Sequence, residues 1–226
     1  MKQEIFIRQN LSRFCMIGVT AVIITVTGIL FRQSVLRILP LYVSLIVGML
    51  QSRANRYAYL LGGLNSILYM LVYLYLGLFA SAAYCLLFSF PMQIATFIKW
   101  GHNRRGHSTV FRRMSGKLRI LISAGFLAAF VILYFVLKAT GASHQLLDNL
   151  SSLLGTLTAV LTMLAFIEYT WIMLPSGLIG IALNIATMTT HPEQITYLVY
   201  SIYSFICIVQ QFFRVRKLYA EQNILN

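Results

Sequence analysis

Long apolar segments fill almost the whole chain, and short polar segments separate them. A helix needs about 20 apolar residues to cross a bilayer, and most of these segments approach or reach that length. They lack the alternation of apolar and polar residues that marks the strands of a membrane barrel. Since only helices and closed barrels satisfy their backbone hydrogen bonds in lipid, the segments predict transmembrane helices. The predicted helices span residues 11–31, 35–51, 57–76, 78–100, 118–138, 146–167, 171–190 and 194–213.

The composition leaves no room for a soluble domain. Of the 226 residues, 59% are hydrophobic and 10% are charged, and the mean hydropathy is +0.78. Soluble domains carry about 25% charged residues. The expected fold class is therefore an all-α integral membrane protein with about eight transmembrane helices.

The charges predict the orientation of these helices. The chain has 18 lysines and arginines against 5 acidic residues, a formal net charge of +13. Most of the basic residues fall in the two terminal segments and in the loops on one side of the predicted helices, which the positive-inside rule places in the cytoplasm. We therefore expect a multi-pass protein of the inner (plasma) membrane with both termini cytoplasmic. The charge predicts contact with the lipid bilayer and no nucleic-acid partner, although the basic loop could also bind a nucleotide or a regulator.

A weak internal repeat appears when Tyr59 is aligned with Trp171, an offset of 112 residues. This offset superimposes the second, third and fourth helices on the sixth, seventh and eighth. The predicted divisions are an N-terminal helix at 1–34, a first three-helix repeat at 35–100, a basic loop and connector helix at 101–139, and a second repeat at 140–226. Parallel repeats of this kind occur in secondary transporters, which bind substrate between the repeats near the middle of the membrane.

Signals for enzymatic chemistry are scarce. The four histidines lie in loops, and Cys15, Cys85 and Cys207 are far apart without the spacing of metal ligands. We therefore predict no catalytic residues, no metal and no cofactor. Asp148 and Glu168 lie at helix ends, whereas ion-coupled transporters carry acids in mid-span, so passive transport is favoured. A proton-coupled symporter that uses Glu168 is an alternative.

Polar and aromatic residues within the predicted helices are candidates for the substrate site. An amide in lipid costs free energy unless it faces a partner or a ligand, although it can also bond a neighbouring helix. The candidate residues are Asn65, Tyr69, Gln93, Trp171, Asn184 and Tyr200. Pro91 and Pro175 each remove a backbone hydrogen bond and are candidate hinges, but Pro175 could also sit unstrained in a first helical turn.

Four segments carry a family resemblance. They are GGLNSILY at 62–69, GLFAS at 77–81, DNLSS at 148–152 and EYTW at 168–171. Together with the parallel repeats, they resemble the PnuC family of vitamin transporters. The resemblance implies a fold similar to that of the SWEET sugar transporters, a homotrimer, and facilitated diffusion of nicotinamide riboside with trapping by phosphorylation. Two positions depart from the family: Leu174 replaces the second tryptophan of a Trp-x-x-Trp pair, and Tyr84 replaces a glutamine.

These observations lead to one hypothesis for the mechanism. The protein is expected to carry nicotinamide riboside by alternating access, with Trp171 and Tyr69 stacking on the base. Three amides, Asn65, Gln93 and Asn184, would bind the ribose hydroxyls. Thiamine, riboflavin or a (deoxy)nucleoside are alternative substrates, and a membrane receptor or scaffold that binds without transporting is an alternative of another class.

Overall fold

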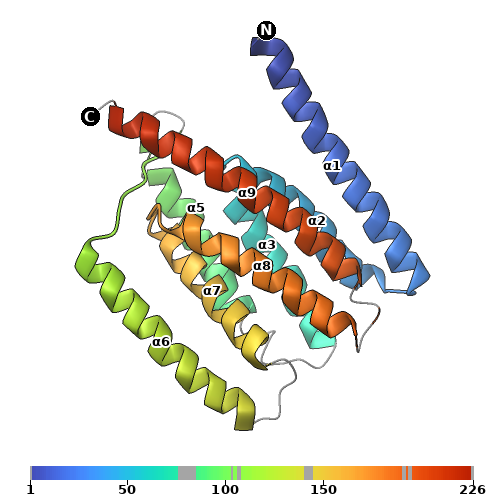
Figure 1. The fold of residues 1–226 in the computed structure, drawn as a ribbon. Coiled ribbons are helices and arrows are strands. Elements are labelled where there is room, and N and C mark those ends of the chain that lie inside the picture. The colour runs from blue at the N-terminus through green and yellow to red at the C-terminus, as the bar shows by residue number, and fades with distance from the viewer. Residues whose placement is uncertain are drawn as a thin grey trace.

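The chain forms a bundle of long helices (Figure 1). The structure is a computed structural model and describes residues 2–75, 85–102, 104–105, 108–139, 145–189, 192 and 195–224. Its α-helices in these ranges are α1 (Lys2–Leu30), α2 (Val35–Ser52), α3 (Tyr57–Tyr75), α5 (Phe90–His102), α6 (Gly116–Ala139), α7 (Gln145–Met163), α8 (Tyr169–Met188) and α9 (Ile195–Ile224). A π-helix, η1 (Cys85–Ser89), leads directly into α5. Two short antiparallel strands, β1 (Arg104–Arg105) and β2 (Ser108–Thr109), lie in the basic loop.

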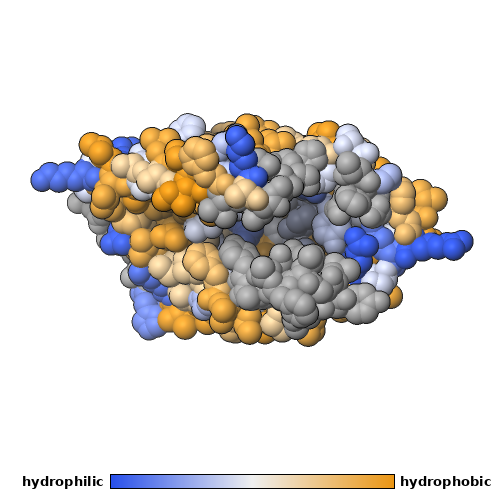
Figure 2. All heavy atoms as spheres, turned by 90° about the horizontal axis from the view of Figure 1, so that it is seen from below, coloured by the Kyte–Doolittle hydropathy of each residue, from blue (hydrophilic) through white to orange (hydrophobic). Residues whose placement is uncertain are grey.

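The all-helical membrane fold is confirmed. Four of the described helices, α2, α6, α8 and α9, are long and apolar enough to cross a membrane, and α1, α3 and α7 contain shorter apolar stretches. Many large apolar side chains on the outside of the bundle are exposed (Figure 2). Those of α6 include Ile120, Leu121, Leu127, Ile132 and Phe135. Such a surface is compatible with lipid and incompatible with water.

Several predicted helix ends differ from the structure. α7 ends at Met163 and not at residue 167, because residues 164–168 form a turn in which Ala165 has a φ of 54°. α9 continues to Ile224, well beyond the predicted end at 213, since Val215 and Leu218 on this extension are buried. α1 likewise begins nine residues earlier than predicted, at Lys2. Residues 76, 78–84, 190 and 194 of the predicted helices lie outside the described residues.

The two halves of the bundle pack in the same way. In the first half α3 packs against α2 and α5, and in the second half α8 packs against α7 and α9. The halves meet through two contacts, α2 with α9 and α5 with α7. Each of these joins the first helix of one half to the last helix of the other, so a two-fold pseudosymmetry relates them. Of the two remaining helices, α1 packs against α2 and α9, and α6 packs against α7 at the other flank (Figure 1).

The turns between the first two helices of each half are equivalent, but with an offset of 111 residues. In the first turn the Ala54 N–H donates to Gln51 O and the Asn55 N–H to Leu50 O, and two more such bonds start α3. The same four bonds recur 111 residues later, beginning with Ala165 N–H to Thr162 O. Ala54 and Ala165 both have a positive φ, 52° and 54°. The alignment of Tyr59 with Trp171 was therefore wrong by one residue.

Candidate functional site

A cavity of about 270 Å³ lies between the two halves of the bundle. Described residues from both halves line it: Gln51, Tyr59, Phe88, Ser89, Met92, Gln93, Thr96, Gly155, Thr158, Ala159, Thr162, Tyr169, Met173, Ser176, Ser204, Ile208 and Gln211. The volume is close to the lower end of the range for small-molecule pockets, about 300 Å³. Its position agrees with the expectation that a parallel-repeat transporter holds its substrate between the repeats.

The described lining of the cavity is polar but uncharged. It offers three glutamine amides and several serine, threonine and tyrosine hydroxyls, with apolar side chains between them. None of the lining residues that the structure describes is Asp, Glu, Lys, Arg or His. Such a lining can form hydrogen bonds to a ligand and can stack on a flat ring through Phe88, Tyr59 or Tyr169. It supplies no ion-pair partner to an anion.

Gln93 enters the cavity because Gly62 leaves room for it. The Gln93 amide donates to the hydroxyl of Ser66 at 3.1 Å and, less closely, to that of Ser89 at 3.3 Å. The two serine hydroxyls are themselves 2.9 Å apart. A Cβ added at Gly62 would overlap the Gln93 Oε1 atom. The position of this amide therefore depends on a glycine on the facing helix.

Two tyrosines line one end of the cavity. Tyr59 comes from the start of α3 and Tyr169 from the start of α8, and the Gln211 amide donates to the Tyr169 hydroxyl at 3.0 Å. Behind them lies Trp100, which is fully buried and whose ring centroid is 4.8 Å from that of Tyr59. Its indole N–H donates to the Thr162 carbonyl oxygen at 2.7 Å. This end of the cavity is thus closed by packed aromatic rings.

The cavity also reflects the pseudosymmetry. Gln51 and Thr162 are equivalent at the 111-residue offset, because their carbonyl oxygens accept equivalent turn hydrogen bonds. Both residues line the cavity. Equivalent positions near the ends of α2 and α7 thus contribute an amide and a hydroxyl to the same space.

Of the six predicted substrate residues, Gln93 is the one that lines the cavity. Asn65 is buried between helices, where its amide donates to Ser44 Oγ at 2.7 Å and to Pro40 O at 3.1 Å. The Tyr69 hydroxyl lies 3.5 Å from the same Ser44 Oγ atom. These two side chains therefore join α3 to α2 in this conformation.

The predicted residues of the second half lie outside the cavity lining. The Asn184 amide donates to Ser201 Oγ at 2.7 Å, which joins α8 to α9. Tyr200 packs in a second apolar cluster between α1, α2 and α9. Trp171 is 56% exposed, and its ring faces the Arg216 guanidinium at 4.7 Å and Phe212 at 4.9 Å. The substrate roles of these residues stay predictions.

The two prolines differ in their helical surroundings. Pro91 is the second residue of α5 and lies two residues after the end of the π-helix that supplies Phe88 and Ser89 to the cavity. Short π-helical turns often occur at functional sites, so a hinge here would move cavity residues. Pro175 lies inside α8, beyond its first turn, because α8 begins at Tyr169. It therefore removes a helix hydrogen bond.

The sequence reasoning missed most of the lining residues. Gln51, Thr158, Thr162, Tyr169 and Gln211 were not predicted, although all five are polar or amphipathic residues within or beside apolar segments. Thr158 and Thr162 are four residues apart, which places them on one face of α7. That spacing was the available signal for a polar face toward the cavity.

A bundle of apolar helices in two equivalent halves around a polar cavity defines a membrane transporter for a small molecule. The family model for the nicotinamide mononucleotide transporter matches residues 34–213, and the chain belongs to this family. The structure is similar to the crystal structure of the vitamin B3 transporter PnuC, with a TM-score of 0.75 and 16% sequence identity over 94% of this chain and 92% of that chain. At this identity the similarity shows the fold. Among curated proteins, none matches the chain by sequence.

Proposed function

We propose that this protein carries nicotinamide riboside across the plasma membrane by facilitated diffusion and binds it in the cavity between the two halves. The uncharged lining of that cavity is the observation that carries the proposal. Amides and hydroxyls suit the ribose hydroxyls and the carboxamide of this substrate. Its pyridinium ring is a flat cation, which the faces of tyrosine rings attract.

The same lining argues against a nucleotide as substrate. A phosphate group needs arginine, lysine or an equivalent donor set, and burying it without a partner costs several kcal/mol. The described lining offers no cationic side chain. We therefore favour the nucleoside over the nucleotide, although the family carries the nucleotide in its name.

Calorimetry on the purified protein tests this choice. We expect nicotinamide riboside to bind at least about tenfold more tightly than nicotinamide mononucleotide, because the phosphate would be desolvated without a cation. Thiamine, riboflavin and deoxynucleosides are measured in parallel. Equal affinity for the nucleotide would contradict the proposal, and tighter binding of another vitamin would change the substrate.

Counterflow in liposomes separates a transporter from a receptor, because a receptor exchanges no riboside across the bilayer. Uptake that is insensitive to an ionophore would support facilitated diffusion over proton coupling.

The aromatic partner of the base is a separate prediction. Tyr169 lines the cavity, whereas Trp171 would have to leave Arg216 and Phe212 to reach it. A stacked ring contributes on the order of 1–3 kcal/mol, so Tyr169→Leu is expected to weaken riboside binding about tenfold or more. Trp171→Ala is expected to have the smaller effect. A larger loss for Trp171→Ala in folded protein would restore the original assignment of stacking to Trp171.

The remaining assignments rest on the family resemblance and on the charge pattern. We propose a homotrimer with cytoplasmic termini, in which phosphorylation inside the cell traps the transported riboside. The positive-inside rule supports the orientation, because the basic loop and both basic terminal segments then share one side. We also propose Pro91 and Pro175 as hinges for alternating access.

A further inference from the structure

Residues 110–115, which we call the strap, connect β2 to α6 and run beside the turn between α7 and α8. The Arg112 N–H donates to Ala165 O at 3.0 Å, and the Ile167 N–H donates to Arg112 O at 2.9 Å. These bonds make a parallel bridge between Arg112 and Phe166. The Arg112 guanidinium also lies 4.3 Å from the centroid of the Phe166 ring. The strap is thus bound to this turn by both backbone and side chain.

Phe111 of the strap completes the aromatic layer at the tyrosine end of the cavity. It is 4% exposed, and its ring centroid lies 5.4 Å from that of Trp100 and 6.4 Å from that of Tyr169. Tyr59 and Tyr169 face the cavity, while Trp100 and Phe111 pack behind them. The four rings therefore form one packed layer at this end of the cavity.

Phe111 is the ring that can move at least cost. Tyr59, Trp100 and Tyr169 belong to α3, α5 and α8, so moving them would break helix packing. Phe111 belongs to a segment without regular structure, which is held by the two bonds of the Arg112 bridge and by the bonds of the Phe111 and Met114 N–H groups to side chains. One of these bonds joins the Phe111 N–H to the Gln222 side chain at the end of α9, at 3.1 Å. Segments with few backbone bonds open more readily than packed helices.

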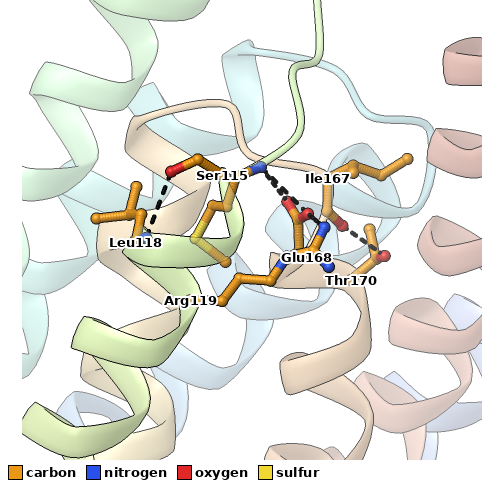
Figure 3. A network of polar contacts seen from close by, with 7 residues as sticks. Ser115, Leu118, Arg119, Ile167, Glu168 and Thr170 are labelled. Carbon is orange, nitrogen blue, oxygen red and sulfur yellow. Dashed lines mark hydrogen bonds and ion pairs between the residues drawn. The ribbon is translucent and has the colours of Figure 1, made fainter.

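Glu168 joins the strap and the first turns of α6 to the start of α8 (Figure 3). Its carboxylate accepts the Met114 N–H at 3.2 and 3.3 Å and pairs with Arg119 at 2.6 Å. The Glu168 side chain is only 15% exposed. Charge-assisted bonds in such a position are shorter and stronger than neutral ones. This carboxylate does not line the cavity, so it acts on the strap and not on the substrate.

We propose that the strap is the gate at this end of the cavity and that Glu168 is the positioning residue that holds it closed. Release of residues 110–115 from the α7–α8 turn then withdraws Phe111 and opens a path past the aromatic layer. The proposal deepens the transport function proposed above and rests on it. It also gives the basic loop a role beyond that of a topology signal.

A reversible cross-link tests the gate directly. Arg112 and Phe166 are the paired residues of the parallel bridge, so Arg112→Cys and Phe166→Cys place two thiols on adjacent segments for cross-linking. We expect oxidation to slow riboside counterflow in liposomes on the order of tenfold or more, and a reductant to restore it, because opening precedes passage. The controls are the variants that carry Arg112→Cys alone or Phe166→Cys alone, because the chain already contains Cys15, Cys85 and Cys207. Counterflow that continues unchanged with the cross-link verified by mass spectrometry would overturn the proposal.

A second measurement needs no substrate. With Trp171→Phe as background, Trp100 is the remaining tryptophan and its fluorescence reports on the aromatic layer. Glu168→Gln is expected to raise acrylamide quenching of Trp100 about twofold, because the strap opens more often. Glu168→Asp keeps the charge and should restore part of the protection, and Glu221→Gln on the exposed end of α9 is the matched control. Quenching that is equal in all these variants would refute the role of Glu168, whereas failure of riboside to bind any variant would refute the proposed substrate alone.

Discussion

Gly155→Phe is expected to abolish riboside binding without unfolding the protein. Gly155 lies on α7 and lines the cavity, and a Cβ placed there meets no atom within 4 Å. A phenylalanine ring would therefore project into the cavity and occupy space that the ligand needs, at little cost to helix packing. Calorimetry on the purified variant should show binding below the limit of detection, while its thermal unfolding temperature stays close to that of the parent protein.

Gly125→Phe is the matched control for this test. Gly125 also lies in a transmembrane helix, α6, and a Cβ there likewise meets no atom within 4 Å. It is exposed on the outer face, so a ring there would contact lipid or detergent. We expect normal binding in this variant. Retained riboside binding by folded Gly155→Phe would place the substrate elsewhere and would contradict the proposed site.

The helices could be predicted because lipid imposes a simple rule on the chain. A span must be apolar, long enough and helical, and these properties are visible in a single sequence. The ends were less predictable, because packing decides them as well as hydropathy. The C-terminal part of α9 carries Arg214, Arg216 and Lys217 and so looked like a polar tail, yet the neighbouring Val215 and Leu218 are buried.

The substrate residues were harder to predict, since a buried amide has two possible partners. Asn65 and Asn184 satisfy their donors on the neighbouring helices, at Ser44 and Ser201. Gln93 does the same with Ser66 but still borders the cavity. These helices are apolar on most faces, so their sequence does not indicate which face is turned toward the cavity. The spatial arrangement of the two halves supplies that information.

The sequence alignment of the two repeats was displaced by one residue, because residue types alone do not show which face of a helix is turned toward the cavity. One residue corresponds to about 100° around a helix. The pattern of aromatic residues matched Tyr59 with Trp171, but the turn hydrogen bonds match Tyr59 with Thr170. Tyr59 and Thr170 are both buried, at 6% and 0% exposed, whereas Trp171 is turned outward. On α8 the cavity is lined by Tyr169, and Trp171, two residues further along, lies about 200° around the helix from it.

Trp100→Ala is expected to destabilise the protein more than any other substitution considered above. The Trp100 side chain is fully buried and touches Tyr59 and Phe111 edge to face, and its N–H satisfies the Thr162 carbonyl. Truncation of a buried tryptophan costs about 3–5 kcal/mol, because it removes contacts and leaves a cavity. Thermal unfolding in detergent, followed by light scattering or by a thiol-reactive dye, measures the loss.

The other tryptophan of the chain provides the control for that loss. Trp171→Ala removes the same side chain from a position that is 56% exposed, so we expect a cost below about 1 kcal/mol. Trp100→Phe keeps a ring but removes the indole N–H that bonds the Thr162 carbonyl oxygen, which still accepts the Ala165 N–H, so it should cost about 0.5–1.5 kcal/mol. This order, Trp100→Ala above Trp100→Phe above Trp171→Ala, follows from burial and hydrogen bonding alone. Equal unfolding temperatures for the two alanine variants would mean that Trp100 is not packed in the aromatic layer. The strap would then not close the tyrosine end of the cavity.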